Sequence, residues 1–368
     1  MRRTFLKQSL VATSLISSVF ALGFASPGAQ LTSLSASIKN WGIFNTSGSS
    51  ISAVNAWKIE EGSRNVVVAV IDTGVDSTHR DLQGNIWSDP TQKGSQVYGW
   101  NFVTNKANPI DDHGHGTHVS GIIGAVVNPK TGVSGVAHKV SIMAIKYYSD
   151  ANPGSVNLRN TIKAVDYAIE HGAKIINYSG GGPEFSEEEY LAIKKAEAKG
   201  ILFVAAAGNE HQNTDLTENY YFPAAYRLSN IISVAATDIK NNLLPSSNWG
   251  KARVDVAAPG ENIYSTLPGG KYGYMSGTSQ ATAFVTGMAA LLLAQDPTLK
   301  PTQIKELIMG SVDKIPGLKD KLATGGRVNA YAALMALKGK ANGKSTPGLI
   351  ATRPVSMLQL FTDLGSSQ

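Results

Sequence analysis

The feature that most constrains this chain is a series of short apolar runs bounded by turn-forming or charged residues. Five of these runs are nearly continuous in apolar character: 66–72, 141–146, 174–179, 201–208 and 231–237. A strand with one solvated face alternates between apolar and polar residues, whereas a strand covered on both faces is apolar throughout. The runs therefore predict strands of a parallel sheet that is buried on both faces.

Helical patterns lie between these runs and after the last of them. Residues 158–172 carry apolar residues at helical spacing and end at a glycine, and 186–200 begin with Ser186 as a cap followed by acids. A further helix is expected over 281–295, and the pattern ends near Leu337. Strand, helix and strand in succession form right-handed crossovers. We therefore expect an α/β fold with a mostly parallel central sheet flanked by helices.

Composition excludes several classes of protein. Apolar residues make up 42% of the 368 residues and charged residues 16%, which is typical of a folded globular chain and not of a disordered one. Three cationic residues in the first 25 positions supply half of the net charge of +6, and no basic stripe with interleaved aromatics is present, so a nucleic-acid partner is not expected. The absence of cysteine excludes disulfides, thiolate zinc sites and a cysteine nucleophile.

The N-terminus has the pattern of an export signal. Arg2, Arg3 and Lys7 precede a moderately apolar stretch that is diluted by serine and threonine, and small residues follow at Gly23-Phe24-Ala25. Such a stretch is a poor membrane span, which needs about 20 mostly apolar residues. We interpret 1–25 as a cleaved signal peptide, of the twin-arginine type rather than an ordinary Sec signal, and expect a periplasmic or extracellular protein.

The remaining chain divides into three parts. Residues 26–40 are expected to be a short linker, too short to contain a folded prosegment. Residues 41–338 carry all of the strand and helix patterns and are expected to form one domain. Residues 339–368 follow the last helical pattern and are interpreted as a C-terminal tail of unknown role.

Four polar residues stand where an α/β sheet keeps its sites. Asp72 ends a buried apolar run, and Asn209 follows another after a glycine. His115 and Ser279 each stand at the start of a predicted helix. Ligands of open α/β sheets bind at the carboxyl ends of the strands, and backbone N–H groups at a helix start are free to stabilise an anion. These residues supply an acid, a base, a nucleophile and an amide donor.

The histidines of residues 111–121, DDHGHGTHVSG, allow a second interpretation. His113, His115 and His118 have the H-x-H-x-x-H spacing of a metal site, and imidazole is the commonest protein ligand of zinc. From these residues alone, a metal site and a general base both remain open.

The motifs as a set resemble the subtilisin family of serine proteases. Asp-Thr-Gly at 72–74, His-Gly-Thr-His at 115–118 and Gly-Thr-Ser-x-Ala at 277–281 occur in that order. The resemblance covers about Trp41 to Leu337 and includes three further stretches, at 176–182, 205–209 and 258–268. It implies a subtilisin-like three-layer sandwich and an exported serine endopeptidase that acts as a monomer on protein or peptide substrates.

The resemblance also assigns roles to the four residues. Ser279 would be the nucleophile, His115 the general base and Asp72 the group that orients it, while the Asn209 side chain and the Ser279 N–H would stabilise the oxyanion. It favours the general base over the metal site for His115. A non-catalytic peptide-binding protein on the same fold is the alternative.

The resemblance further implies a peptide groove. Its members would be Ser179, Gly180 and Gly181 as an exposed edge, Ala206, Ala207 and Gly208 as the opposite wall, and Tyr221 as the floor. Glycine at position 180, where the family usually has a bulkier apolar residue, leaves one wall of the first pocket without a side chain. The resemblance also implies broad activity on unfolded chains with apolar or aromatic residues before the cut. Phe222-Pro223 aligns with a cis-proline turn.

Structural calcium is the implied cofactor. The principal ligands would be Asp81, Asn128 and the carbonyls of Val126, Lys130 and Val133, which are hard oxygen donors that suit calcium. A weaker site would use Asp238 with the carbonyls of Ala224 and Tyr226. In one further respect the chain departs from the family, because Gln280 follows the serine where methionine is common.

Overall fold

The computed structural model describes residues 37–92 and 97–341 of the chain. In this part a central sheet has the strand order β10-β11-β7-β6-β5-β4-β1-β3-β2, and β8 and β9 form a separate antiparallel hairpin. The bounds of the strands are β1 Gly62–Asp72, β2 Gly99–Asn101, β3 Lys139–Lys146, β4 Ile175–Tyr178, β5 Leu202–Ala206, β6 Ile231–Thr237, β7 Val256–Pro259, β8 Ile263–Leu267, β9 Lys271–Met275, β10 Asp313–Lys314 and β11 Gly326–Arg327.

The central sheet is parallel except at one edge, where β10 runs antiparallel to β11. Each of the five predicted runs forms one of its strands: β1, β3, β4, β5 and β6. The predicted α/β fold with a mostly parallel sheet is therefore confirmed.

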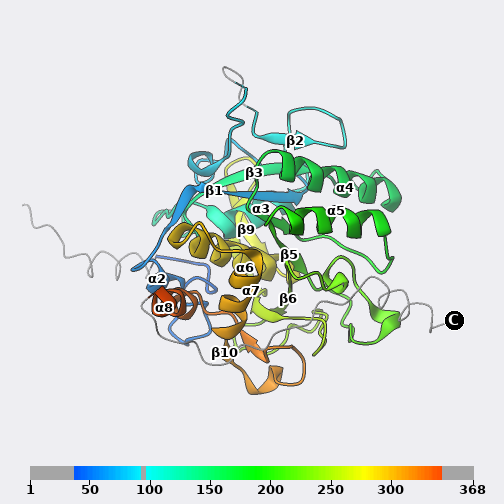
Figure 1. Ribbon diagram of the computed structural model, residues 1–368. Coiled ribbons are helices and arrows are strands. Elements are labelled where there is room, and N and C mark those ends of the chain that lie inside the picture. The colour runs from blue at the N-terminus through cyan, green and yellow to red at the C-terminus, as the bar shows by residue number, and fades with distance from the viewer. Residues whose placement is uncertain (1–36, 93–96, 342–368) are drawn as a thin grey trace, which may run out of the picture.

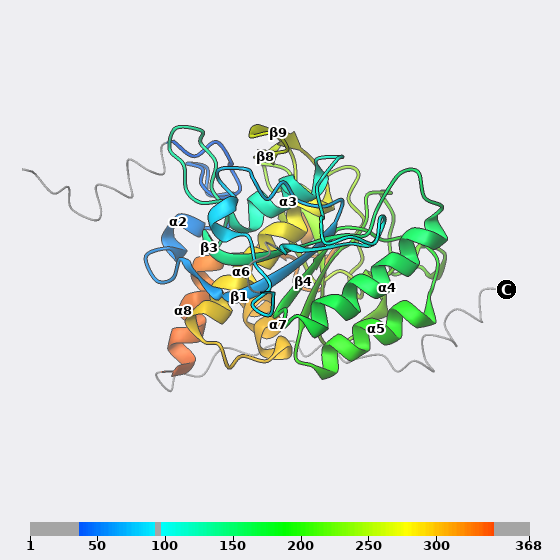
Figure 2. The same cartoon turned by 90° about the horizontal axis from the view of Figure 1, so that it is seen from above.

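Helices cover both faces of the sheet (Figures 1 and 2). Helices α4 (Gly154–Glu170) and α5 (Glu187–Ala198) pack on one face. The other face carries α2 (Ala53–Ala56), α3 (His115–Gly124), α6 (Thr278–Gln295), α7 (Pro301–Gly310) and α8 (Ala330–Ala341). Short 3-10 turns lie at Gln83–Asn85, Thr217–Asn219, Ala224–Tyr226 and Pro316–Leu318. No helix within the described ranges is both long and apolar enough to cross a membrane.

The strands contribute alternate residues to two cores. Along β1, Val68 and Val70 join the cluster beneath α3 and α6, whereas Ala69 and Ile71 join the cluster beneath α4 and α5. Successive side chains of a strand point to opposite faces, so a strand covered on both sides needs apolar residues at every position. This is the physical reason for the unbroken apolar runs of the sequence.

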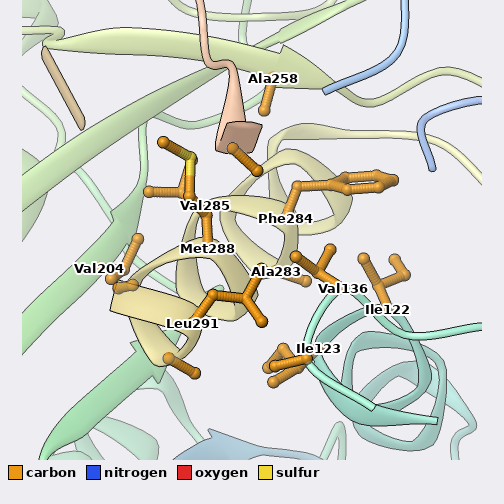
Figure 3. Packing of buried hydrophobic residues seen from close by; sticks show 14 of the residues in the cluster. Ile122, Ile123, Val136, Val204, Ala258, Ala283, Phe284, Val285, Met288 and Leu291 are labelled. Carbon is orange, nitrogen blue, oxygen red and sulfur yellow. The ribbon is translucent and has the colours of Figure 1, made fainter. Parts of the chain in front are cut away.

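Helix α6 passes through the larger core (Figure 3). Its residues from Thr278 to Leu293 are buried on every side, which explains why its sequence has no polar stripe. Phe284 packs so closely on Gly42 that a Cβ built at position 42 would overlap its ring. A rigid, fully buried α6 holds its first turn in a fixed place at the edge of the sheet.

The observed boundaries differ slightly from the predicted ones. Helix α6 begins at Thr278, before the predicted start at 281, and α8 continues to Ala341, beyond the predicted domain end at 338. The last linker residues belong to the folded domain, because the Lys39 N–H donates to the Gly132 carbonyl and the Asn40 side chain is buried. The predicted signal peptide, residues 26–36 of the linker and the tail from 342 lie outside the described residues.

Candidate active site

The four candidate catalytic residues lie at the carboxyl edge of the parallel sheet. Asp72 is the last residue of β1, and Asn209 follows the end of β5. His115 is the first residue of α3, and Ser279 is the second residue of α6. The carboxyl ends of parallel strands lie at the same edge of the sheet, so the fold brings residues that are far apart in the sequence close together there.

Asp72 and His115 are directly paired. The His115 Nδ1 lies 2.7 Å from Asp72 Oδ1, and the Thr73 N–H donates to the same oxygen at 2.7 Å. Burial by itself would lower the pKa of His115, but the charge and hydrogen bond of Asp72 and the charge of Asp111 raise it above its ordinary value. The pair therefore leaves Nε2 as the imidazole nitrogen available for proton transfer.

Asp111 is a site residue that the sequence reasoning missed. Its Oδ1 accepts from the Thr73 hydroxyl at 2.8 Å and from the Gly114 N–H at 2.8 Å, and its Oδ2 accepts from the Thr117 N–H at 2.9 Å. Burial would raise the pKa of Asp111, but these donors lower it overall. The carboxylate therefore joins the end of β1 to the start of α3 and fixes how His115 meets Asp72. The sequence feature that could have indicated this role is its place shortly before a predicted helix start, where an acid is favoured.

Ser279 projects from the start of α6. The residue before the helix, Gly277, has φ 150°, a conformation that side chains rarely adopt, and its N–H donates to the Gly260 carbonyl at 2.8 Å. The Ser279 hydroxyl donates to the Ser179 carbonyl at 3.2 Å. Ser279 thus sits where the free N–H groups of a helix start meet the half-buried segment that follows β4.

Asn209 is held with its amide oxygen engaged. Oδ1 accepts from the Thr278 N–H at 2.9 Å and from the Thr278 hydroxyl at 3.2 Å. The loop that carries it is held by Asn248, a second residue the sequence reasoning missed, which donates to the Ala207 carbonyl at 2.9 Å and accepts from the Glu210 N–H at 3.1 Å. The Nδ2 hydrogens are the part of the Asn209 amide that is left to donate to a ligand.

The predicted groove edge contains an unexpected neighbour. Ser179, Gly180 and Gly181 follow β4, and a Cβ built on Gly180 would overlap the hydroxyl of Tyr147. The space beside Gly180, which has no side chain of its own, is therefore occupied by Tyr147, the residue that follows β3. In the sequence, two tyrosines, Tyr147 and Tyr148, follow the apolar run 141–146. No local pattern relates them to position 180, so this contact could not be predicted.

Tyr221 lies between the two predicted walls of the first pocket. A Cβ built on Gly181 would overlap its ring at Cε1, and a Cβ built on Gly208 would lie 3.0 Å from Cδ2 of the same ring. Ala207 and Tyr221 line the same small gap, and Ala206 is buried at the end of β5. The Phe222–Pro223 bond that follows is cis, as the sequence predicts. Tyr221 is thus a neighbour of Gly181, Ala207 and Gly208.

The three clustered histidines do not converge on one point. His115 pairs with Asp72, whereas His118 is buried and its Nε2 lies 3.0 Å from the Ile263 carbonyl. Burial and the neighbouring His115 lower the pKa of His118 to about 4. His113 is exposed. Across the described ranges, no three His, Asp or Glu residues group as metal ligands would.

The surroundings of Asp81 do not fit the calcium ion that the sequence implies. The carboxylate accepts from Asn128 Nδ2 at 2.8 Å, from the Thr131 hydroxyl at 3.3 Å and from the Tyr272 hydroxyl at 2.6 Å. A calcium site presents several oxygen acceptors to the ion. The side chains around Asp81 are instead hydrogen-bond donors to its carboxylate. The Val133 carbonyl is also engaged, by the Asn128 N–H at 3.0 Å.

The second predicted cation site, at Asp238, is a local turn. Its Oδ1 accepts from the N–H groups of Lys240 and Asn242, each at 2.8 Å, and its Oδ2 accepts from the Asn242 amide at 2.9 Å. A carboxylate that accepts from residues two and four positions ahead needs no cation.

Comparison with known proteins identifies the family. The model of the Subtilase family matches residues 63–332. The chain is a subtilase. It is 42% identical over 284 residues to thermitase of Thermoactinomyces vulgaris, a match that covers 77% of this chain and 93% of thermitase. It is 39% identical over 246 residues to the major intracellular serine protease of Bacillus subtilis (strain 168), covering 66% of this chain and 72% of that protein.

A solved structure agrees with the fold of this subtilase. A cold adapted subtilisin-like serine proteinase superposes with a TM-score of 0.61 at 32% identity, covering 74% of this chain and 89% of that one. The predicted family and fold are thereby confirmed, and the subtilase is a serine endopeptidase.

Proposed function

We propose that Ser279, His115 and Asp72 carry out peptide-bond hydrolysis in this subtilase. Ser279 Oγ attacks the scissile carbonyl, and His115 Nε2 takes its proton and gives it to the leaving amine as the C–N bond breaks. Water, deprotonated by His115, then hydrolyses the Ser279 ester and restores the hydroxyl, while Asp72 stabilises the imidazolium in both steps. The observation that carries this proposal is the 2.7 Å contact between Asp72 and His115 Nδ1, because it fixes the tautomer. The Ser279 hydroxyl turns from the Ser179 carbonyl to His115 when substrate binds, since catalytic hydrogen bonds tighten in the complex.

The oxyanion of the tetrahedral intermediate is stabilised by two donors. One is the Asn209 amide, whose oxygen is held by Thr278 so that its hydrogens are available. The other is the Ser279 N–H at the start of α6, where the helix leaves N–H groups without partners. Both donors belong to segments held rigidly by buried contacts, which is what such stabilisation requires.

The substrate binds as an extended strand along Ser179–Gly181. An exposed edge of this kind adds a peptide strand through backbone hydrogen bonds, while side chains enter neighbouring pockets. Tyr221 between Gly181 and Gly208 gives the first pocket an aromatic surface. We therefore keep the expectation of broad cleavage after apolar or aromatic residues.

The enzyme is proposed to be an exported monomer of the periplasm or the cell exterior. This rests on the twin-arginine pattern at residues 1–25. Calcium at Asp81 is not part of the proposal, since Asn128, Thr131 and Tyr272 supply the donors that a cation would replace.

Hydrolysis of an unfolded protein, with the cut sites identified by mass, tests this function. The wild-type enzyme is expected to cut after apolar and aromatic residues. Ser279→Ala and His115→Ala should each lower kcat by about 10⁶, and Asp72→Asn by about 10⁴. Retained turnover in Ser279→Ala would refute the assignment of the nucleophile. A wild-type enzyme that binds unfolded chains without cutting them would favour the non-catalytic alternative.

A further inference from the structure

A cavity of about 590 Å³ adjoins the substrate edge. It lies between the end of β3, the start of α4 and the Gly181–Glu184 segment. Gly181 belongs both to this cavity and to the edge, and the next residue, Gly182, exchanges backbone hydrogen bonds with Phe222 at 2.9 and 2.8 Å. The cavity therefore has a fixed wall and opens beside the path of a bound peptide.

The lining of the cavity combines aromatic rings with negative charge. Its residues are Tyr147, Tyr148, Pro153, Gly154, Ser155, Asn157, Leu158, Tyr178, Gly181, Gly182, Pro183, Glu184, Glu189 and Phe222. Two of them are carboxylic acids, and none of these lining residues is Lys, Arg or His. Glu184 is exposed at the rim, whereas Glu189 is only 3% exposed.

Glu189 has fewer donors than an ionised carboxylate requires. It is the third residue of α5, and its Oε2 lies 2.8 Å from the Tyr226 hydroxyl. The single proton of that hydroxyl is shared with the Ser186 carbonyl, 2.9 Å away. No donor to Oε1 is found within residues 37–92 and 97–341. Burial raises the pKa of Glu189 to about 7, although Tyr226 lowers it in part.

A buried carboxylate without a cation is costly for a fold, and a cation brought by a ligand removes much of that cost. The tyrosine and phenylalanine rings suit the aliphatic stem of a long basic side chain and can also face its charge. An apolar side chain would fill the same space but would leave Oε1 without a partner. A basic side chain can do both: its stem packs on the rings and its cation pairs with the carboxylate.

We propose that this cavity binds the side chain of a substrate lysine or arginine, with its cation at Glu189. The proposal rests on the protease function and names the side chain that this part of the peptide groove prefers. The Ser179 carbonyl contacts the Ser279 hydroxyl, and Gly181 lies two residues further along the edge, about 7 Å at the rise of a strand. The basic residue is therefore separated from the scissile bond by at least one residue, on the amino-terminal side.

The test uses peptides that differ at one position. Arginine, lysine, glutamine, leucine or glutamate is placed two, three or four residues before a fixed cleavage site, and kcat/KM is measured. We expect arginine and lysine to exceed glutamine and glutamate by about tenfold or more at one of these positions. Glu189→Gln should reduce this ratio to about one. Glu188→Gln is the matched control, since Glu188 is exposed, precedes Glu189 in α5 and does not line the cavity, and it should keep the ratio.

Binding of the same peptides to Ser279→Ala, measured by calorimetry, separates this proposal from the catalytic one. If wild-type turnover is absent but Ser279→Ala still binds arginine peptides about tenfold tighter than glutamine peptides, the pocket is correct and the catalytic proposal fails. Equal affinities and equal kcat/KM at all three positions would overturn the pocket. A preference that survives Glu189→Gln would overturn the role of Glu189.

Discussion

At the residue scale, the acid–base behaviour of the site depends on two carboxylates around His115. Asp72 contacts the imidazole directly, whereas Asp111 acts through its charge and through the segment that carries His115. Both raise the pKa of His115 against the effect of burial. Because a general base must be unprotonated, activity is expected to fall as the pH decreases through this raised pKa.

Asp111→Asn should therefore move the acidic limb of the kcat/KM profile to lower pH. Removal of the negative charge makes protonated His115 less stable, so its pKa decreases. Asp112→Asn is the control, since Asp112 is exposed and pairs with Lys146 at 2.7 Å. An acidic limb that stays in place or moves to higher pH in Asp111→Asn would contradict the role given to Asp111.

Asn209→Leu should lower kcat by about 10²–10³ with a smaller change in KM, because the lost hydrogen bond forms mainly in the transition state. Steady-state kinetics on one peptide substrate measure both constants. A loss confined to KM would instead indicate that Asn209 binds the ground state.

Gln280 should make the enzyme tolerant to peroxide. It is buried beside the nucleophile, and a glutamine cannot form the sulfoxide that methionine forms. Activity remaining after peroxide treatment is the measurement, with Gln280→Met as the matched variant that should become sensitive. Rapid loss of wild-type activity, not exceeded by the variant, would disprove this expectation.

At the scale of elements, the loop between α3 and β3 is held to the rest of the fold by Asp81. Its carboxylate collects donors from Asn128 and Thr131 in this loop and from Tyr272 in β9. This loop, β9 and the segment that carries Asp81 are thus joined by one buried acid.

A strong chelator is expected to leave the melting temperature unchanged, because protein donors occupy the position of a cation at Asp81. Tyr272→Phe should reduce the free energy of unfolding by about 1–3 kcal/mol, since it removes a donor to a buried charged group. Thermal and denaturant melts with and without the chelator measure both effects. A marked fall in melting temperature on chelation, restored by added calcium, would refute this account of the loop.

At the scale of the whole molecule, the sequence predicts what depends on local pattern and spacing. The five apolar runs become strands because both faces of the sheet are covered, and the glycine-flanked motifs place Asp72, His115, Asn209 and Ser279 at one edge. Contacts between distant segments could not be predicted this way. Two examples are the hydrogen bond between Asp111 and Thr73 and the contact of Tyr147 with Gly180. Both depend on how the folded strands, helices and loops pack against one another.

The central claim is that Ser279 is an activated nucleophile, and covalent labelling tests it most directly. A serine-directed phosphonate is incubated with the folded protein, and the intact mass and the modified peptide are determined. We predict one adduct per chain, on Ser279, and none in Ser279→Ala or in the unfolded protein. Absence of an adduct on the folded wild-type protein, or an adduct that persists in Ser279→Ala, would contradict the account.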